Sequence, residues 1–414
     1  MNEHRLVCSC GAVVPGDTWA CPRRGDGADH VLVLPLPEWS VDERFEQPFV
    51  RYRRMLRSWV VAGGDGADGW FIEQAQRLDD AVAGVDGHGF TRTPCTVVDF
   101  GGGGPDGSPA GPRPVTVKDE TGNVAGSHKA RHTFGLMLHL LGRERAGHWD
   151  ADRRPTLAIA SCGNAAVAAA VVAAAQQWPI TVFVPVDAEA GAVARLKELE
   201  ATVEFCPRLD GESGDPSYLR FQEAVQAGAV PFGCQGPDNG YTLDGGRTLG
   251  YELAEQAPDI DRLYIQVGGG ALAASLAQGL AAAGRRPALM AVQAEGCAPL
   301  ERAWTGTEAL GGLKKARRQR SAVMWPWTPT PASAASGILD DETYDWAAIV
   351  EAMADSGGAP LVVPEELVVV AHRLGTSVTG IPASPTGTAG LAGLLHDNPP
   401  PDATPAVIFT GVER

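Results

Sequence analysis

The stretch from Leu157 to Pro185 constrains the fold more than any other part of the chain. The apolar run 157–160 predicts a buried strand, 167–177 predicts a helix that ends before Pro179, and 180–185 predicts a second strand. Strands joined through a helix in this way run parallel, because a parallel pair needs a long crossover connection. The chain is therefore expected to contain a parallel sheet that is covered by helices.

The same alternation returns further along the chain. Helices are predicted over 190–200 and from about Thr242 to Gln256, and another ends near Ala283. The strands expected between and after them are 202–205, 262–267, 288–293 and 406–409. A chain of 414 residues is long enough for two domains of this kind. The pattern predicts an α/β fold with helices on both faces of its sheets.

Charge and composition exclude several classes of function. The net charge of −16 argues against nucleic acid as a partner, since phosphate binding requires clustered Lys and Arg. No run of about 18 apolar residues predicts a membrane span, and Met1–Arg5 lacks the apolar core of a signal peptide. The eight cysteines, without a secretory signal, are expected to be reduced thiols. We expect a cytoplasmic enzyme with no membrane partner.

A lysine follows a short strand at the start of another predicted helix. The strand covers 115–118, and the helix runs on through Leu141 with Ser127 as its expected N-cap. Lys129 would then lie at the positive end of a helix dipole, with Arg131 and His128 as cationic neighbours. Both effects favour a neutral amine, which can form a Schiff base. Taken alone, such a lysine is more often an ordinary surface residue.

A glycine-rich turn separates strand 262–267 from the helix after it. Gly268, Gly269 and Gly270 precede Ala271 and Leu272. Successive backbone N–H groups at a helix N-terminus can bind a phosphate. Close packing of a strand against a helix also requires glycine, so the turn alone is a weak signal.

Four motifs in this order resemble those of fold-type II pyridoxal-phosphate (PLP) enzymes, especially the threonine synthase family. The first is 123–131, Asn-Val-Ala-Gly-Ser-His-Lys-Ala-Arg, and the second is 161–165, Ser-Cys-Gly-Asn-Ala. The glycine turn is the third, and Thr410-Gly411 at the end of the last strand is the fourth. The resemblance covers roughly 88–414. It implies a tryptophan synthase β-like α/β fold with two doubly wound parallel-sheet domains and the cofactor between them.

The resemblance also implies a role for each motif. Lys129 would hold PLP, and after displacement by the substrate amine it would act as the general base at Cα. Asn164 would bond the PLP 3′-oxygen, and Thr410 would face the pyridine nitrogen. The phosphate would bind Gly268, Gly269, Gly270, Ala271 and Leu272. The carboxylate of a small amino-acid substrate would bind Ser161, Cys162, Gly163, Asn164 and Ala165. This site needs no metal ligand.

The same resemblance suggests a domain organisation. Residues 1–86 would form an N-terminal arm, and 87–414 would form the catalytic region of two interleaved subdomains, the smaller one roughly 125–235. The family also implies a homodimer.

The N-terminal arm begins with Cys8, Cys10 and Cys21, which look like a zinc-ribbon-like segment found on some threonine synthases. A structural zinc site needs four ligands, and beyond these three thiols the sequence offers only His4 or His30 nearby. A degenerate knuckle without metal is therefore predicted.

The predicted type of reaction depends on Thr410, whose hydroxyl would face the pyridine nitrogen. A neutral hydroxyl cannot keep the pyridine nitrogen protonated as a carboxylate does, so the cofactor would be a weak electron sink. β- or γ-elimination or replacement is then favoured over transamination, as in threonine synthase. A β-eliminating ammonia-lyase of the threonine or diaminopropionate type and a non-catalytic PLP-binding protein are the alternatives.

The chain departs from the family pattern around the cofactor. His128 replaces a phenylalanine, Ala130 an aspartate, and Cys162 a hydroxyl residue. These changes suggest a divergent member with an altered substrate. Cys162 is predicted to be a small buried hydrophobe rather than a reactive thiol. Arg131, His132 and Arg247 are candidates for binding a substrate phosphate.

Overall fold

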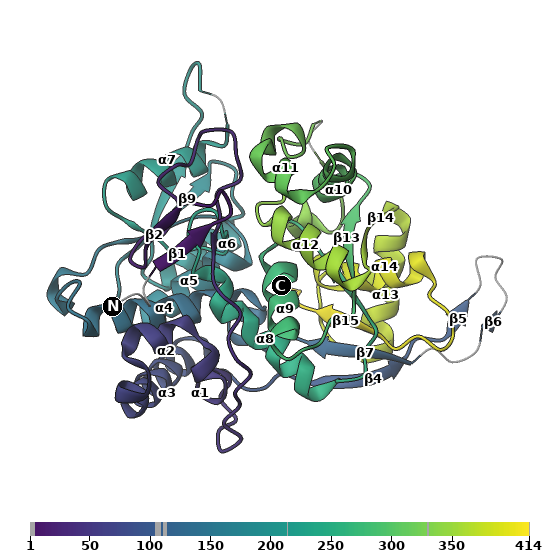
Figure 1. The fold of residues 1–414 in the computed structure, drawn as a ribbon, viewed down its shortest axis with the longest axis horizontal. Coiled ribbons are helices and arrows are strands. Elements are labelled where there is room, and N and C mark those ends of the chain that lie inside the picture. Colours follow the sequence, from purple (N-terminus) through teal and green to yellow (C-terminus); the bar gives the residue numbers. More distant parts are fainter. Residues whose placement is uncertain (1–4, 104–108, 111–113, 213, 329–330, 414) are drawn as a thin grey trace. The chain divides into compact units, whose positions relative to one another are not determined.

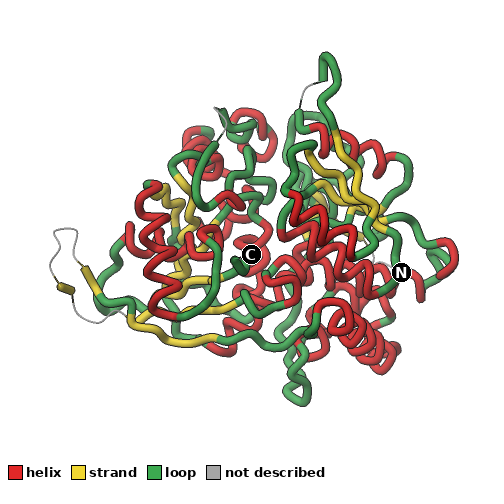
Figure 2. The backbone as a smooth tube through the Cα atoms, turned by 180° about the vertical axis from the view of Figure 1, so that it is seen from behind, coloured by secondary structure: helices red, strands yellow, loops and turns green. Residues whose placement is uncertain are grey.

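The computed structural model describes residues 5–103, 109–110, 114–212, 214–328 and 331–413. It divides into two compact units. Unit 1 comprises Met1–Cys21, Val31–Arg92 and Asn123–Thr248, and unit 2 comprises Pro22–His30, Thr93–Gly122 and Leu249–Arg414. Helices accompany the strands in both units (Figures 1 and 2), so the predicted α/β fold is confirmed.

The sheet of unit 1 has four parallel strands in the order β10-β9-β8-β11. Its strands are β8 (Leu157–Ala160), β9 (Ile180–Pro185), β10 (Thr202–Cys206) and β11 (Val230–Pro231). The helices that accompany them are α5 (Asn164–Ala175), α6 (Ala190–Glu198) and α7 (Pro216–Gln226). Strands β8 and β9 have the predicted bounds, whereas α5 begins at Asn164, three residues earlier than expected.

Helix α4 (Lys129–Arg145) forms the centre of unit 1. Residues 130–143 are all buried, and α4 packs against α5 and against α2 (Arg57–Ala62). It also meets α8 (Thr242–Gln256), where a Cβ atom on Gly135 would lie 2.6 Å from the Cα of Gly245. Only glycine permits this backbone approach. The buried helix therefore fixes the position of Lys129 at its first turn.

The N-terminal part of unit 1 consists of short elements. Its antiparallel sheet has the order β2-β1-β3, with β1 (Arg5–Cys8), β2 (Val13–Pro15) and β3 (Leu32–Val33). The helices after it are α1 (Pro48–Arg51), α2 and α3 (Asp68–Asp86). Leu6, Val14 and Leu32 of the small sheet belong to the same apolar core as α4 and α5.

The sheet of unit 2 has six strands in the order β14-β13-β12-β15-β7-β4. These are β4 (Cys95–Asp99), β7 (Pro114–Asp119), β12 (Arg262–Gln266), β13 (Ala288–Ala294), β14 (Ala359–Val363) and β15 (Pro405–Phe409). Five strands are parallel, but β4 pairs antiparallel with β7. The predicted parallel-sheet architecture is thus confirmed for these five strands, and β4 adds one antiparallel strand at the edge.

Helices lie on both faces of this sheet. Figure 1 shows α9 (Ala271–Ala282) and α12 (Trp346–Ser356) on one side, and α13 (Glu365–Thr379) and α14 (Pro385–Asp397) on the other. The unit also contains α10 (Pro299–Ala309), α11 (Leu313–Arg318) and the short strands β5 (Gly102–Gly103) and β6 (Pro109–Ala110). Single 3₁₀ turns in the two units are Arg53–Met55, Gly64–Ala67, Val124–Gly126, Ala151–Arg153, Arg320–Ala322 and Ser336–Ile338. Among the described residues, no helix combines the length and the hydropathy that a membrane crossing requires.

Candidate active site

Lys129 is the first residue of α4 and is half-buried. The N-cap position is taken by His128, whose side chain makes no capping hydrogen bond, so the prediction of Ser127 as N-cap is wrong by one residue. The Ser127 hydroxyl still accepts the Lys129 N–H, at 3.4 Å. His128 therefore occupies the N-cap position of α4, while Ser127 supplies the hydrogen bond to the first turn.

The backbone just before Lys129 adopts a strained conformation. Ala125 has φ = 55° and Gly126 has φ = 67°, both in the left-handed region. A residue with a Cβ atom adopts this region at a cost of ~1–2 kcal/mol. The Ala125 N–H donates to Asp86 Oδ2 at 2.7 Å, which holds the turn in place. Such strain is often found at functional sites. Asp86, 39 positions away, could not be found from the motif.

Two uncharged imidazoles accompany Lys129 in unit 1. Burial, followed by the neighbouring side chains of Lys129, His132 and Arg131, keeps the pKa of His128 well below its ordinary value. Burial, again followed by Lys129, lowers the pKa of His132 to about 3. His132 donates its Nδ1–H to the carbonyl oxygen of Thr242 at 2.8 Å. His128 thus stands in place of the family phenylalanine as an uncharged aromatic ring, and Ala130 lies fully buried in the core.

The three basic residues proposed to bind a substrate phosphate all bind protein groups. Arg131 is fully buried and donates to Thr248 Oγ1 at 3.1 Å, and His132 is held by Thr242. Arg247 donates to the carbonyl oxygens of Leu34 and Pro35 at 3.0 and 3.2 Å. Their contacts in the structure are those of residues that stabilise unit 1.

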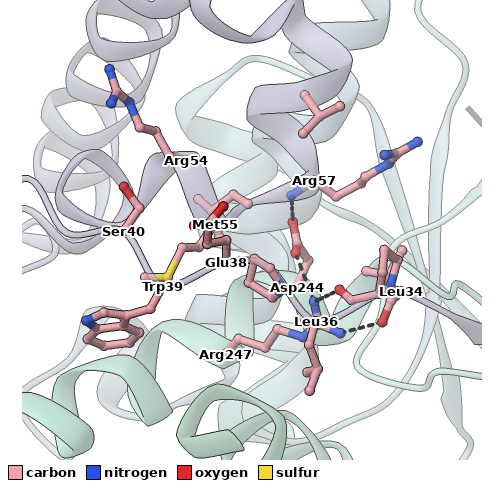
Figure 3. A pocket seen from close by; sticks show the side chains of 14 residues that line it. Leu34, Leu36, Glu38, Trp39, Ser40, Arg54, Met55, Arg57, Asp244 and Arg247 are labelled. Carbon is pink, nitrogen blue, oxygen red and sulfur yellow. Dashed lines mark hydrogen bonds and ion pairs between the residues drawn. The ribbon is translucent and has the colours of Figure 1, made fainter. Parts of the chain in front are cut away.

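Figure 3 shows the surroundings of Arg247. A cavity of about 480 Å³ lies in unit 1 between the stretch 34–40, residues around α2, and the first half of α8. Neither Lys129 nor loop 161–165 lines it. Asp244 in its wall accepts the backbone N–H of Arg57 at 2.7 Å. The cavity is therefore separate from the predicted cofactor residues of this unit.

Loop 161–165 connects β8 to α5, which packs against α4. Asn164 is the first residue of α5, with Gly163 in the N-cap position, so the loop amides lie at the positive end of a helix dipole. Ser161 Oγ accepts the Gly163 N–H at 3.4 Å. Cys162 is exposed, which contradicts the prediction of a buried side chain. Partial desolvation and nearby carboxylates raise the pKa of its thiol, as expected for an unreactive cysteine.

The predicted phosphate turn of unit 2 follows β12. Gly270, with φ = 102°, occupies the N-cap of α9 and offers no side chain to cap it. The turn is also tightly packed, because a Cβ on Gly269 would lie 2.9 Å from the Tyr344 ring and one on Gly270 would lie 2.8 Å from Ile349. At Gly268 the added atom would meet the carboxylate of Asp340. Packing alone thus explains the glycines, while the uncapped N-terminus also suits an anion.

Thr410 lies at the carboxyl end of β15 and is 3% exposed. Strands β12 and β15 are parallel neighbours, so the glycine turn and Thr410 lie at the same edge of one sheet. Ser384 accepts the Gly387 N–H at 3.2 Å and caps α14. Unit 2 thus offers backbone amides and a hydroxyl at one edge.

A buried ion pair in unit 2 connects β7 to α8. Lys118 Nζ lies 2.6 Å from Glu252 Oε2, and neither side chain is exposed to solvent. Lys118 also donates to the Thr93 carbonyl oxygen at 2.7 Å and to Gln256 Oε1 at 2.8 Å. None of the predicted motifs includes this network, although a lysine in an apolar strand was a signal for it.

Comparison with known proteins identifies the family. The model of the pyridoxal-phosphate dependent enzyme family matches residues 95–411, well over half of the chain. The chain belongs to this family. PLP is therefore its cofactor, and the fold is that of fold-type II PLP enzymes, as predicted.

Several curated relatives carry different activities. Serine racemase of Oryza sativa subsp. indica is 26% identical over 57% of this chain and 63% of its own length. Threonine synthase of Methanosarcina acetivorans is 26% identical over 69% of this chain and 65% of its own length. L-threonine ammonia-lyase of Thermotoga maritima is 29% identical over 44% of this chain and 42% of its own length. The matches thus span less than two thirds of each relative.

Solved structures support the same fold. Maize serine racemase has a TM-score of 0.60 at 18% identity and covers 83% of this chain and 93% of its own. Diaminopropionate ammonia lyase from Escherichia coli has a TM-score of 0.60 at 17% identity and covers 83% of this chain and 89% of its own. At these identities the likeness shows the fold alone.

Proposed function

We propose that this PLP-dependent enzyme catalyses β- or γ-elimination or replacement on an α-amino acid, in the manner of threonine synthase-like enzymes. The observation that supports the proposal most is the buried Thr410 at the sheet edge that also carries the glycine turn. A hydroxyl facing the pyridine nitrogen disfavours the protonated ring on which transamination depends.

PLP, when bound, delocalises electron density from the Cα atom of an amino acid attached to it. The described residues fit this cofactor. We propose that Lys129 holds it and moves the Cα proton, and that Gly268–Leu272 bind its phosphate through backbone N–H groups. Asn164 would orient the ring through the 3′-oxygen, and Ser161–Ala165 would bind the substrate carboxylate.

A β-eliminating ammonia-lyase is the second candidate. The observation in its favour is that Arg131, His132 and Arg247 all bind protein groups, so none of these three candidate residues is assigned to a substrate phosphate. An unphosphorylated hydroxy- or amino-substituted substrate requires no such cation. Both candidates share the same first step, which is removal of the Cα proton by Lys129.

A substrate panel tests the proposal. The purified PLP-loaded enzyme is incubated separately with phosphohomoserine, serine, phosphoserine and threonine, with Lys129→Ala protein as the blank. Threonine formed from phosphohomoserine supports the first candidate, and a keto acid with ammonia supports the second. Pyridoxamine phosphate that accumulates as fast as product forms would overturn elimination, and D-serine as the only product would indicate a racemase. The homodimer and the cytoplasmic location stay predictions, and light scattering on the purified protein tests the former.

A further inference from the structure

The first 33 residues contain a cluster of metal-binding side chains outside the candidate active site. The ligand atoms of Cys8, Cys10, Cys21 and His30 all lie within 4.8 Å of one another. Cys8 and Cys21 are each 2% exposed and His30 is 6% exposed. None of the three thiols forms a disulfide. Three thiols and one imidazole make a typical ligand set for structural zinc.

The local backbone explains how these residues converge. Cys8 ends β1, and the turn after it brings Cys10 back, with the Gly11 N–H donating to the Cys8 carbonyl oxygen at 2.7 Å. His30 precedes Val31, which exchanges hydrogen bonds with Ser9, at 2.8 Å through its carbonyl oxygen and at 3.0 Å through its N–H. The short β1–β3 ladder thus holds Val31, the residue that follows His30, beside the turn that carries the first two thiols.

The distances suit a metal rather than a disulfide. The Sγ atoms of Cys10 and Cys21 are 3.9 Å apart. Zn–S bonds of about 2.3 Å in a tetrahedron separate two sulfurs by about 3.8 Å. A disulfide would require about 2.05 Å between the sulfurs. The two sulfurs therefore lie one tetrahedral edge apart.

His30 also has the outer contact that a metal-binding histidine typically has. Its Nε2 lies 2.7 Å from Asp26 Oδ1, and a carboxylate there fixes the proton on Nε2. The lone pair is then on Nδ1, the nitrogen that can bind a metal. The same Asp26 oxygen accepts the Ala28 N–H at 2.9 Å, which orients the carboxylate.

We propose that Cys8, Cys10, Cys21 and His30 bind one Zn²⁺ ion in a closed, structural site. The proposal replaces the metal-free knuckle expected from sequence; His4, the other candidate ligand, lies outside the described residues. Four protein ligands fill a tetrahedral shell, so the ion stabilises the fold and activates no water. Strands of two to four residues are too short to be stable alone, and metal binding can supply the missing free energy.

The site stabilises contacts that lead toward α4 within unit 1. The Gly240 N–H donates to the Trp19 carbonyl oxygen at 2.9 Å, and the Trp19 ring packs edge-on to His139 of α4 at 5.8 Å. Loss of zinc is therefore expected to lower thermal stability. The reaction should require the metal only indirectly, through folding.

Metal analysis of the full-length protein tests the proposal. Purified protein dialysed against metal-free buffer should keep one zinc per chain by plasma mass spectrometry. Cys21→Ser should lose it, whereas the control Cys206→Ser, a buried thiol of β10 outside the cluster, should keep it. His30→Cys, which restores four ligands, should also keep one zinc and remain folded even if the serine variant does not.

Cobalt supplies a direct view of the coordination shell. Zinc-free wild-type protein with added Co²⁺ should show the intense visible bands of a tetrahedral thiolate site, and these bands should change in His30→Cys. Protein that retains no zinc and gives no such bands would overturn the proposal. So would a Cys10–Cys21 disulfide found in the intact native chain, or zinc content equal in Cys21→Ser and the control.

Discussion

The two units offer their predicted cofactor residues in different chemical settings. In unit 1, Lys129 stands at the start of a buried helix among cationic and imidazole side chains, two of them kept uncharged by burial. In unit 2, the glycine turn and Thr410 lie at a sheet edge where backbone amides and a hydroxyl are offered. Unit 1 therefore offers one amine at the start of a helix, and unit 2 offers a turn of backbone amides without side chains.

This difference indicates how the family pattern can diverge. Around Lys129, the residues that differ from the family motif are still buried, as His128 and Ala130 show. Around the glycine turn, Tyr344 and Ile349 leave no space for a Cβ, so sequence change is restricted there. Substrate choice is therefore expected to depend on unit 1 more than on unit 2.

The largest expected effect is on turnover. Lys129→Ala should lower kcat at least ~100-fold, because it removes the proposed general base and cofactor anchor. The control is Lys197→Ala, which changes an exposed lysine in the same unit. Equal rates for the two variants in the substrate panel would place the catalytic amine elsewhere.

The buried ion pair of unit 2 should show the largest effect on stability. Glu252→Gln should lower the free energy of unfolding by about 3–5 kcal/mol, because Lys118 would keep a buried charge without its partner. Urea unfolding measures this, with the exposed Glu366→Gln as control. Adding Lys118→Met should recover much of the loss, and no recovery would contradict the ion-pair explanation.

A substitution in the glycine turn separates its two roles. Gly269→Val should cost about 1–3 kcal/mol of unfolding free energy through overpacking against Tyr344. It should also weaken PLP binding, measured by fluorescence titration below the unfolding temperature. Gly306→Val is the matched control, since its Cβ would lie 2.9 Å from Val323 in the same unit. Equal PLP affinity in the two variants would argue for a phosphate site elsewhere.

A smaller effect concerns pH and His139. Burial, with Arg143 and Arg57 nearby, keeps the pKa of His139 well below 6.5, and neither ring nitrogen has a hydrogen-bond partner among the described residues. Below pH 6.5 the unfolded chain binds a proton that the folded chain does not, so acid destabilises the fold. His139→Phe should abolish this contribution, a gain of roughly 2 kcal/mol at pH 5 from linkage at about 1.4 kcal/mol per pH unit.

Urea unfolding between about pH 7.5 and about pH 5 measures the change, with the exposed His396→Gln as control. The gain should grow as the pH falls, since a phenylalanine side chain cannot be protonated. The new ring should still stack on Tyr241, whose ring lies 4.0 Å from that of His139. A gain that does not vary with pH would contradict the linkage argument.

Local sequence was enough to predict much of the fold. The bounds of β8, β9 and α8 follow from apolar periodicity and breaking residues, and the structure confirms them. The antiparallel β4 could not be read in this way, since strand direction depends on which neighbour a strand pairs with.

The sequence was enough to place the motif residues of the candidate site on their helices and strands, but not to predict which distant residues contact them. Lys129 at a helix start and Thr410 at a strand end follow from the sequence. Lys118 pairs with Glu252, and Ala125 pairs with Asp86. The partners lie far apart in the chain, so motif spacing could not predict either contact. The exposure of Cys162 depends on tertiary packing, which a motif does not contain.

Reduction of the PLP-loaded protein with borohydride, followed by peptide mapping, shows directly whether Lys129 is the residue that holds the cofactor. We expect a pyridoxyl group on the peptide that contains Lys129, and none on this peptide when PLP is omitted. A pyridoxyl group on any other lysine of the wild-type chain would contradict it.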